Sequence, residues 1–224
     1  MLCRLIVALL ILFALSCWAK SPDPFTNPFD NPVDYPNLPR VLIIGDSISI
    51  GYTPKVRKLL RGKANVHRPP TNCRWSAFGE ENIEGWIGES KWDLIHFNFG
   101  LWDWYGWKQE QKANPASYAK NLDGIVRKLK KTQARLVFAV TTPPCVGSER
   151  KVKIVVSEDR AQEFNMSALA VMKKHGVHIN DLYSLIVKDR LKYQRGEDDV
   201  HYTEEGRDFL AKQVAQVIEQ ELSK

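Results

Sequence analysis

The sequence predicts one α/β domain over residues 40–224, in which a parallel sheet is covered by helices on both faces. Segments of strand and helix character alternate along this range, and the expected strands are near-continuous apolar runs. Such runs are typical of parallel strands that are buried on both faces. The chain has 224 residues, 44% of them hydrophobic, which suits a single domain with a full core.

The strands of this sheet are expected where apolar runs are bounded by turn-forming residues. The run ARLVFAVTTPP is the clearest of them, and VHIND is the shortest. The expected strands cover residues 40–45, 64–69, 92–100, 134–144 and 177–181.

Helices are expected between and after these strands, where apolar residues recur at helical spacing. Pro54 near the start and Gly62 after the end delimit a short first helix. Ser157 is the expected N-cap of a later helix, and Gly176 is its expected stop. The expected helices cover residues 53–62, 79–90, 114–132, 157–176 and 203–222.

The segment before residue 40 has a different character. Residues 1–19 join Arg4 to an apolar run of about fifteen residues, shorter than the roughly 20 of a spanning helix. They predict a signal peptide cleaved after Ala19, hence a secreted or periplasmic protein with no stable membrane span in its mature form. The stretch ALSC loosely resembles a lipobox, so lipoprotein anchoring at Cys17 is the second alternative. Residues 20–39 hold six prolines and predict an extended linker or a wrapping arm.

Charge and cysteine content exclude several kinds of partner. The formal net charge of +6 is a mild excess, and its densest basic block, residues 127–131, falls on an expected helix face. Binding to nucleic acid is therefore not expected. No Cys/His cluster has ligand spacing and no Gly-rich phosphate loop occurs, so no metal or organic cofactor is expected. For Cys73 and Cys145, a disulfide and two buried free thiols both remain open.

The loops at the carboxyl ends of parallel strands are where such a sheet binds ligands. Ser47 lies in the first of these loops, just past Gly45, where a strand should meet a helix. A serine hydroxyl is a poor nucleophile unless a base takes its proton. This stretch alone leaves Ser47 open between a nucleophile and a helix cap, so a base must be sought in another loop.

His201 is the histidine best placed to be that base. It lies just before the last helix in GEDDVHYTEEG, whereas three of the other histidines lie in expected strands or at a helix end. An imidazole base needs an acceptor on its second nitrogen to fix its tautomer. Asp198, three residues earlier, can fold back onto the ring, and Asp199 and Glu197 are its substitutes.

Three blocks of the sequence together resemble the SGNH hydrolase superfamily, also called GDSL-like esterases: GDSIS, FNFGLWD and DDVHYTEEG. The stretches NCRWSAFGEENIEGWI, TTPP and NDLYSLI resemble a bacterial exported branch of it, and the resemblance covers residues 40–222. It implies a three-layer α/β/α, flavodoxin-like domain with about five parallel strands. It also implies that Ser47 is the nucleophile, with Asp198 and His201 as its catalytic partners.

The oxyanion hole is where the chain departs from this family. The third block is usually Gly-x-Asn-Asp, and its Asn donates to the oxyanion, but Trp102 stands in that place here. Loss of one such donor costs roughly 10²–10³ in rate, so the Asn has a substitute or the enzyme is weak or inactive. The expected donors are the backbone N–H groups of Ser47 and of Arg74, with Gly79 as the alternative to Arg74, and the side-chain amide of Asn98 or Asn72.

The segment FGLWDWYGW carries the expected substrate-binding residues, Trp102 and Trp104. A platform for a sugar ring and simple hydrophobic packing both remain open for it. The predicted function is a serine esterase that hydrolyses carboxylic esters through an acyl-enzyme, with short acyl groups such as acetyl on carbohydrate. The alternatives are a lysophospholipase or lipase-type esterase, and a catalytically degenerate carbohydrate-binding protein. The expected partner is thus a small-molecule or carbohydrate ester.

Overall fold

The computed structural model describes residues 23–109, 113–145 and 156–224. The predicted signal peptide and the lipobox alternative at Cys17 lie outside the described residues. In the described part of the chain, no helix is long and apolar enough to cross a membrane.

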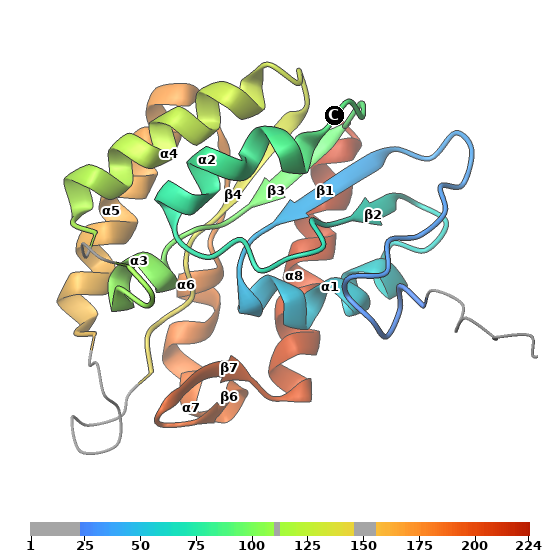
Figure 1. The fold of residues 1–224 in the computed structure, drawn as a ribbon. Coiled ribbons are helices and arrows are strands. Elements are labelled where there is room, and N and C mark those ends of the chain that lie inside the picture. Colours follow the sequence, from blue (N-terminus) through green and yellow to red (C-terminus); the bar gives the residue numbers. More distant parts are fainter. Residues whose placement is uncertain (1–22, 110–112, 146–155) are drawn as a thin grey trace, which may run out of the picture.

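A five-stranded parallel sheet in the order β2-β1-β3-β4-β5 forms the centre of the structure (Figure 1). The predicted fold class is confirmed, and this strand order is that of flavodoxin-like folds. Residues 41–44 of β1 and all of β3 have almost no exposed surface, as their place inside the sheet requires. The strands are β1 (Arg40–Ile44), β2 (Asn65–His67), β3 (Leu94–Phe97), β4 (Arg135–Ala139) and β5 (His178–Asn180).

Five long helices cover the two faces of the sheet (Figure 1). Helices α1 and α8 pack together on one face, and α2, α4 and α5 lie side by side on the other. The predicted stop and cap of α5 are both present, because Ser157 accepts the Arg160 N–H and Gly176 is left-handed. These helices are α1 (Ser47–Leu59), α2 (Ser76–Ile87), α4 (Pro115–Lys130), α5 (Glu158–His175) and α8 (Glu204–Leu222).

The first helix begins six residues earlier than the expected start at residue 53. Asp46 caps it by accepting the Ile48 N–H, so Pro54 lies inside the helix rather than near its start.

Several short helices and strands form where the sequence predicts neither. The first follows β3, and the others form a compact cap over the carboxyl ends of the strands, between β5 and α8 (Figure 1). Strands β6 and β7 of this cap pair as an antiparallel hairpin. The short elements are α3 (Leu101–Tyr105), α6 (Leu182–Ile186), η1 (Val187–Asp189), α7 (Arg190–Tyr193), β6 (Gln194–Gly196) and β7 (Asp199–Tyr202).

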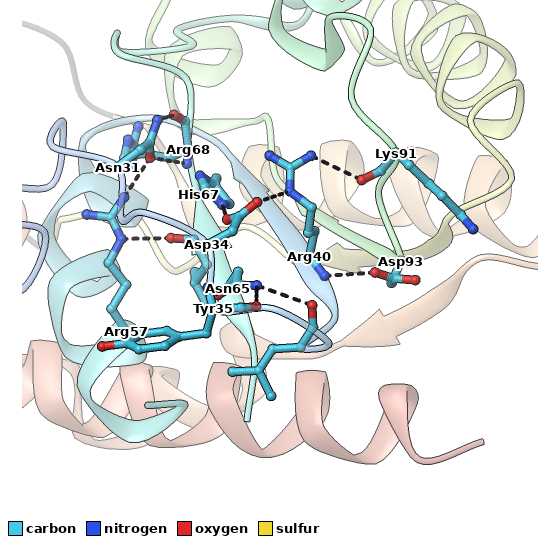
Figure 2. Close-up of polar contacts among 12 residues, drawn as sticks. Asn31, Asp34, Tyr35, Arg40, Arg57, Asn65, His67, Arg68, Lys91 and Asp93 are labelled. Carbon is cyan, nitrogen blue, oxygen red and sulfur yellow. Dashed lines mark hydrogen bonds and ion pairs between the residues drawn. The ribbon is translucent and has the colours of Figure 1, made fainter. Parts of the chain in front are cut away.

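The proline-rich segment before β1 lies against the domain beside β2 and α1 (Figures 1 and 2). The buried Asn65 side chain accepts the Tyr35 N–H and donates to the Tyr35 and Leu38 carbonyls. Asp34 pairs with both His67 and Arg40. Residues 23–39, the N-terminal arm, are therefore tied by side-chain hydrogen bonds to the edge of the sheet that β2 forms.

Candidate active site

The first strand-end loop places Ser47 as the first residue of α1, at the carboxyl end of β1. Asp46, not Ser47, is the cap: its carboxylate accepts the Ile48 N–H at 2.9 Å, and its carbonyl accepts the Ile50 N–H. The Ser47 hydroxyl is therefore not used in capping the helix. The first backbone N–H groups of α1, which have no partner within the helix, point out of this end.

The structure brings Ser47 and His201 together, although 154 positions separate them in the sequence. Ser47 Oγ lies 2.9 Å from His201 Nε2, which is hydrogen-bond distance. His201 Nδ1 lies 2.5 Å from a carboxylate oxygen of Asp199. With Nδ1–H donating to Asp199, Nε2 is left as the acceptor for the serine proton. A nucleophile, a base and an orienting carboxylate are thus aligned in one chain of contacts.

The carboxylate differs from the expected one, since Asp199 and not Asp198 contacts His201. The sequence predicts a loop before the last helix, but this segment forms the β6–β7 hairpin, with Glu197 and Asp198 in its turn. Asp199 and His201 lie two residues apart on β7, so they share one face of that strand. Asp198 is exposed at the turn.

The remaining residues of β7 fix the direction of this pair. Val200 and Tyr202 are buried at 5% and 2% exposure, which turns the alternate residues toward Ser47. Asp199 Oδ1 also accepts the backbone N–H of His201 at 2.9 Å. Partial burial raises the pKa of Asp199, but the two hydrogen bonds from His201 outweigh it and hold that pKa below its ordinary value. Asp199 is therefore an ionised partner for an imidazolium.

A second carboxylate, Asp46, lies buried beside this chain. Burial raises its pKa to about 6, against the Ile48 N–H and the charges of His201 and Arg68, which lower it. One of its oxygens caps α1, and the other has no hydrogen-bond partner among the described residues. This carboxylate adds negative potential near His201 without touching it.

The second strand-end loop differs from expectation at Arg74. Its backbone N–H donates to the side chain of Asn72 at 2.9 Å, so it is not free for an oxyanion. Arg74 has φ +56°, the left-handed conformation that favours glycine. The alternative, Gly79, lies inside α2, where a Cβ would meet the Phe99 ring.

The side-chain amide expected from Asn98 is also engaged elsewhere. Its Nδ2 donates to the Ala139 carbonyl at 2.7 Å and to Thr141 Oγ1 at 3.0 Å, which joins the ends of β3 and β4. Asn98 is thus a structural link, because both of its amide protons are used. Within the described part of the chain, no hydrogen bond occupies Asn72 Nδ2, and Asn72 is partly exposed in the second loop. Asn72 is the amide that remains available.

The two expected substrate-binding tryptophans have different environments. Trp104 is 2% exposed, so it belongs to the core and offers no face to a substrate. Trp102 is partly exposed, and its ring lies 6.0 Å from that of Trp75 and 5.6 Å from that of Trp107. Trp75, in the adjacent NCRW stretch, is an aromatic member of this group that the sequence analysis did not single out.

The two cysteines of the domain are free thiols, and both are buried. Cys73 donates its backbone N–H to the Gly45 carbonyl, and Cys145 lies 3.2 Å from the Tyr105 hydroxyl. Burial raises the pKa of Cys73 to about 12, so it is not a reactive thiolate. In the part of the chain that the structure covers, no cluster of three or more His, Cys, Asp or Glu side chains could hold a metal ion.

Comparison with solved structures finds the same fold in several other proteins. The lipase/acylhydrolase from Enterococcus faecalis is 17% identical, over 82% of this chain and 96% of its own, with a TM-score of 0.68. A GDSL-like lipase from Bacteroides thetaiotaomicron VPI-5482 is 19% identical, over 81% and 88%, with a TM-score of 0.67. An acetyl xylan esterase is 15% identical, over 80% and 99%, with a TM-score of 0.66. At these identities the likeness shows a shared fold.

The sequence itself was compared with curated proteins and with family models. None of the curated proteins matches it. The model of the GDSL-like Lipase/Acylhydrolase family matches residues 43–209, a range that contains Ser47, Asp199 and His201.

Proposed function

From the premise that this chain belongs to the GDSL-like lipase/acylhydrolase family, we propose that it is a serine esterase that acts through an acyl-enzyme. The observation that carries the proposal is the contact of 2.9 Å between Ser47 Oγ and His201 Nε2. The contact between His201 Nδ1 and Asp199 supports it, because it fixes the tautomer that a general base requires.

The proposed reaction uses these three residues in two steps. His201 Nε2 takes the proton of Ser47 as Oγ attacks the ester carbonyl carbon, and Asp199 stabilises the imidazolium that forms. The tetrahedral intermediate collapses when His201 returns this proton to the departing alcohol, which leaves the acyl group on Ser47. A water then attacks the acyl-enzyme with His201 again as the base, and His201 returns that proton to Ser47 Oγ as the carboxylic acid leaves.

The oxyanion of each tetrahedral intermediate needs donors that are already in place. The Ser47 N–H at the first turn of α1 is one, since such groups have no partner within a helix. Asn72 Nδ2 is the proposed second donor, in place of the expected Asn98 and of the Arg74 backbone, whose N–H groups are engaged. The helix start therefore serves both the nucleophile and the charge that it creates.

The proposed substrates are esters of short acyl groups on carbohydrate. The partly exposed rings of Trp75, Trp102 and Trp107 lie together beside the second and third strand-end loops. Tryptophan faces suit the apolar faces of sugar rings. The shared fold with a protein described as an acetyl xylan esterase supports the same substrate class.

Ester hydrolysis by the wild type and by Ser47→Ala tests the proposal. We expect the wild type to hydrolyse p-nitrophenyl acetate and acetylated xylan, and Ser47→Ala to lose at least about 10³-fold in kcat. Equal rates for the two proteins would overturn the esterase proposal and favour a catalytically degenerate carbohydrate-binding protein. A preference for p-nitrophenyl esters of long acyl chains would instead favour the lipase-type alternative.

Export from the cytosol is also part of the proposal, supported by Arg4 and the apolar run that follows it. Expression of the full chain in a bacterium should place a protein starting at Lys20 outside the cytosol. Leu10→Arg should keep the uncleaved protein in the cytosol. A lipid-modified N-terminus at Cys17 would favour the lipoprotein alternative, and uncleaved wild type in the cytosol would contradict export.

A further inference from the structure

Arg68 is a buried cation at the carboxyl end of β2. Its exposure is 1%, although an arginine is rarely buried unless it is paired. The described residues give its guanidinium no direct ion pair, and all its hydrogen bonds go to neutral oxygens. Burial lowers the pKa of Arg68, yet a guanidinium stays protonated in proteins. Its acceptors are the carbonyls of Gly45, Pro69 and Thr71 and the hydroxyls of Ser49 and Thr53.

Two of these acceptors lie in the loops that form the catalytic site. Arg68 Nη2 donates to the Gly45 carbonyl at 3.3 Å, two residues before Ser47. The same nitrogen donates at 3.1 Å to the Thr71 carbonyl, directly before Asn72. One nitrogen of a planar, rigid group therefore holds both the nucleophile loop and the loop of the proposed oxyanion donor.

Other hydrogen bonds also connect these two loops with each other and with the first turn of α1. The Cys73 N–H also donates to the Gly45 carbonyl, at 3.3 Å. Arg68 Nη1 donates to Ser49 Oγ, which itself donates to the carbonyl of the cap residue Asp46. Arg68 thus contacts the first turn of α1 as well as the two loops.

The N-terminal arm holds the backbone of Arg68 in turn (Figure 2). Asn31 Oδ1 accepts the Arg68 N–H at 3.0 Å, and Asn31 Nδ2 donates to the Arg68 carbonyl at 3.0 Å. One side chain therefore satisfies both backbone groups of Arg68, as a neighbouring strand would. The aromatic ring of Phe29 also lies 5.5 Å from the guanidinium carbon.

We propose that Arg68 is a positioning residue, which holds Ser47 and Asn72 at their catalytic separation and which the arm fixes through Asn31. The assignment rests on the proposed esterase function. Arg68 is buried and has no hydrogen bond to His201 among the described residues, so it acts through the two loops. Burying this charge costs free energy. The planar guanidinium binds both loops at once, which a shorter or more flexible side chain does not do.

Arg57 offers a matched control, because it is a second buried arginine that binds the same arm (Figure 2). It is 3% exposed and donates to Asn31 Oδ1 and to the Val66 carbonyl. Its other acceptors are the arm carbonyls of Pro24, Asn27 and Asp30. It shares Asn31 Oδ1 with the Arg68 N–H, but none of its hydrogen bonds reaches a strand-end loop of the site. Loss of its guanidinium should therefore destabilise the protein but disturb Ser47 less than loss of the Arg68 guanidinium.

The experiment compares Arg68→Lys with Arg57→Lys in the full chain, since lysine keeps the charge but lacks the planar fork. Each variant is assayed with p-nitrophenyl acetate well below its own Tm, and reactive Ser47 is counted by labelling with a fluorophosphonate. We expect both variants to lower Tm. Only Arg68→Lys should lower kcat per labelled serine, by about tenfold or more with KM within about twofold, because misplaced groups lose transition-state stabilisation.

Asn31→Ala provides the second variant if Arg68→Lys does not fold. It frees the backbone of Arg68 but leaves the guanidinium, so we expect a fall in kcat of about threefold or more, beyond that of Arg57→Lys. The assignment is overturned if kcat of the folded variants equals that of Arg57→Lys. Wild type without Ser47-dependent hydrolysis would overturn the esterase proposal instead, and the positioning role with it.

Discussion

The carboxylate beside His201 depends on the position of single residues along one short strand. Three acids in a row precede Val200, and spacing alone does not distinguish them. The hairpin does, because residues two apart on a strand share a face and residues three apart do not. Asp199 therefore contacts His201, and Asp198 lies in the turn.

Asp199→Asn should reduce kcat by at least about 10²-fold, because an amide at this position no longer fixes the tautomer or stabilises the imidazolium. Asp198→Asn is the control and should change kcat by less than about threefold, since this side chain is exposed. Steady-state hydrolysis of p-nitrophenyl acetate measures both. A larger loss in Asp198→Asn would restore the Asp-x-x-His arrangement that the family resemblance implies.

At the scale of elements, Asp103 joins α3 to the start of α2. Its carboxylate accepts the Ser76 N–H at 3.0 Å and the Ser76 hydroxyl at 2.5 Å, and it is fully buried. Asn121 of α4 donates to the same hydroxyl. Helix α2 has no side-chain cap of its own, so Asp103 of α3 accepts the N–H group at its start.

The pH dependence of stability should report on Asp103. Burial raises its pKa to about 7, against the hydrogen bonds from Ser76, whereas an unfolded aspartate titrates near 3.8. Between these values the folded state keeps a proton that the unfolded state has lost, so the contribution of Asp103 falls as pH rises from about 4 to 7. Asp103→Asn removes this pH-dependent contribution to the free energy of unfolding.

Urea unfolding of wild type and Asp103→Asn at pH 4, 5, 6 and 7 measures the contribution of Asp103. The difference in unfolding free energy should shift in favour of the variant as pH rises, on the order of 1–4 kcal/mol over this range. Other titrating groups cancel in the difference. A difference that stays constant with pH would mean that burial does not govern the protonation of Asp103.

At the scale of the whole molecule, the N-terminal arm is part of the folded domain rather than a tether. Asp34 of the arm pairs with Arg40 and His67. Asn31 of the arm binds the backbone beyond β2, and Asn65 of β2 binds the backbone of the arm. An open edge at β2 would expose strand groups to other chains. The arm also provides most of the acceptors of the buried Arg57 guanidinium, so its loss would leave this charge with the Val66 carbonyl alone.

Asn65→Ala should lower the free energy of unfolding by about 1–3 kcal/mol, because it leaves the Tyr35 N–H and two arm carbonyls without their partner. Asn82→Ala is the control and should cost less, since that side chain only donates to a carbonyl of its own helix. Thermal and urea unfolding measure both. An equal loss in the two variants would show that the arm adds little to stability.

The sequence by itself determined the fold class, the approximate positions of the strands and long helices, and two of the three proposed catalytic residues. These follow from local physics: apolar periodicity gives the elements, caps give their ends, and parallel strands place their following loops at one edge. Ser47 and His201 were identified because each lies in such a loop beside chemistry-bearing neighbours.

Only the tertiary structure decided which acid contacts His201, which amide has a free N–H group among the described residues, and which tryptophan is exposed. Asn98, Trp104 and the Arg74 N–H carry the right chemistry, but contacts with residues distant in the sequence, or with a nearby turn, already engage or bury them. The role of Arg68 has the same origin, because its acceptors come from separate loops. Hydrogen-bond competition and burial depend on neighbours in space, and local sequence does not specify those neighbours.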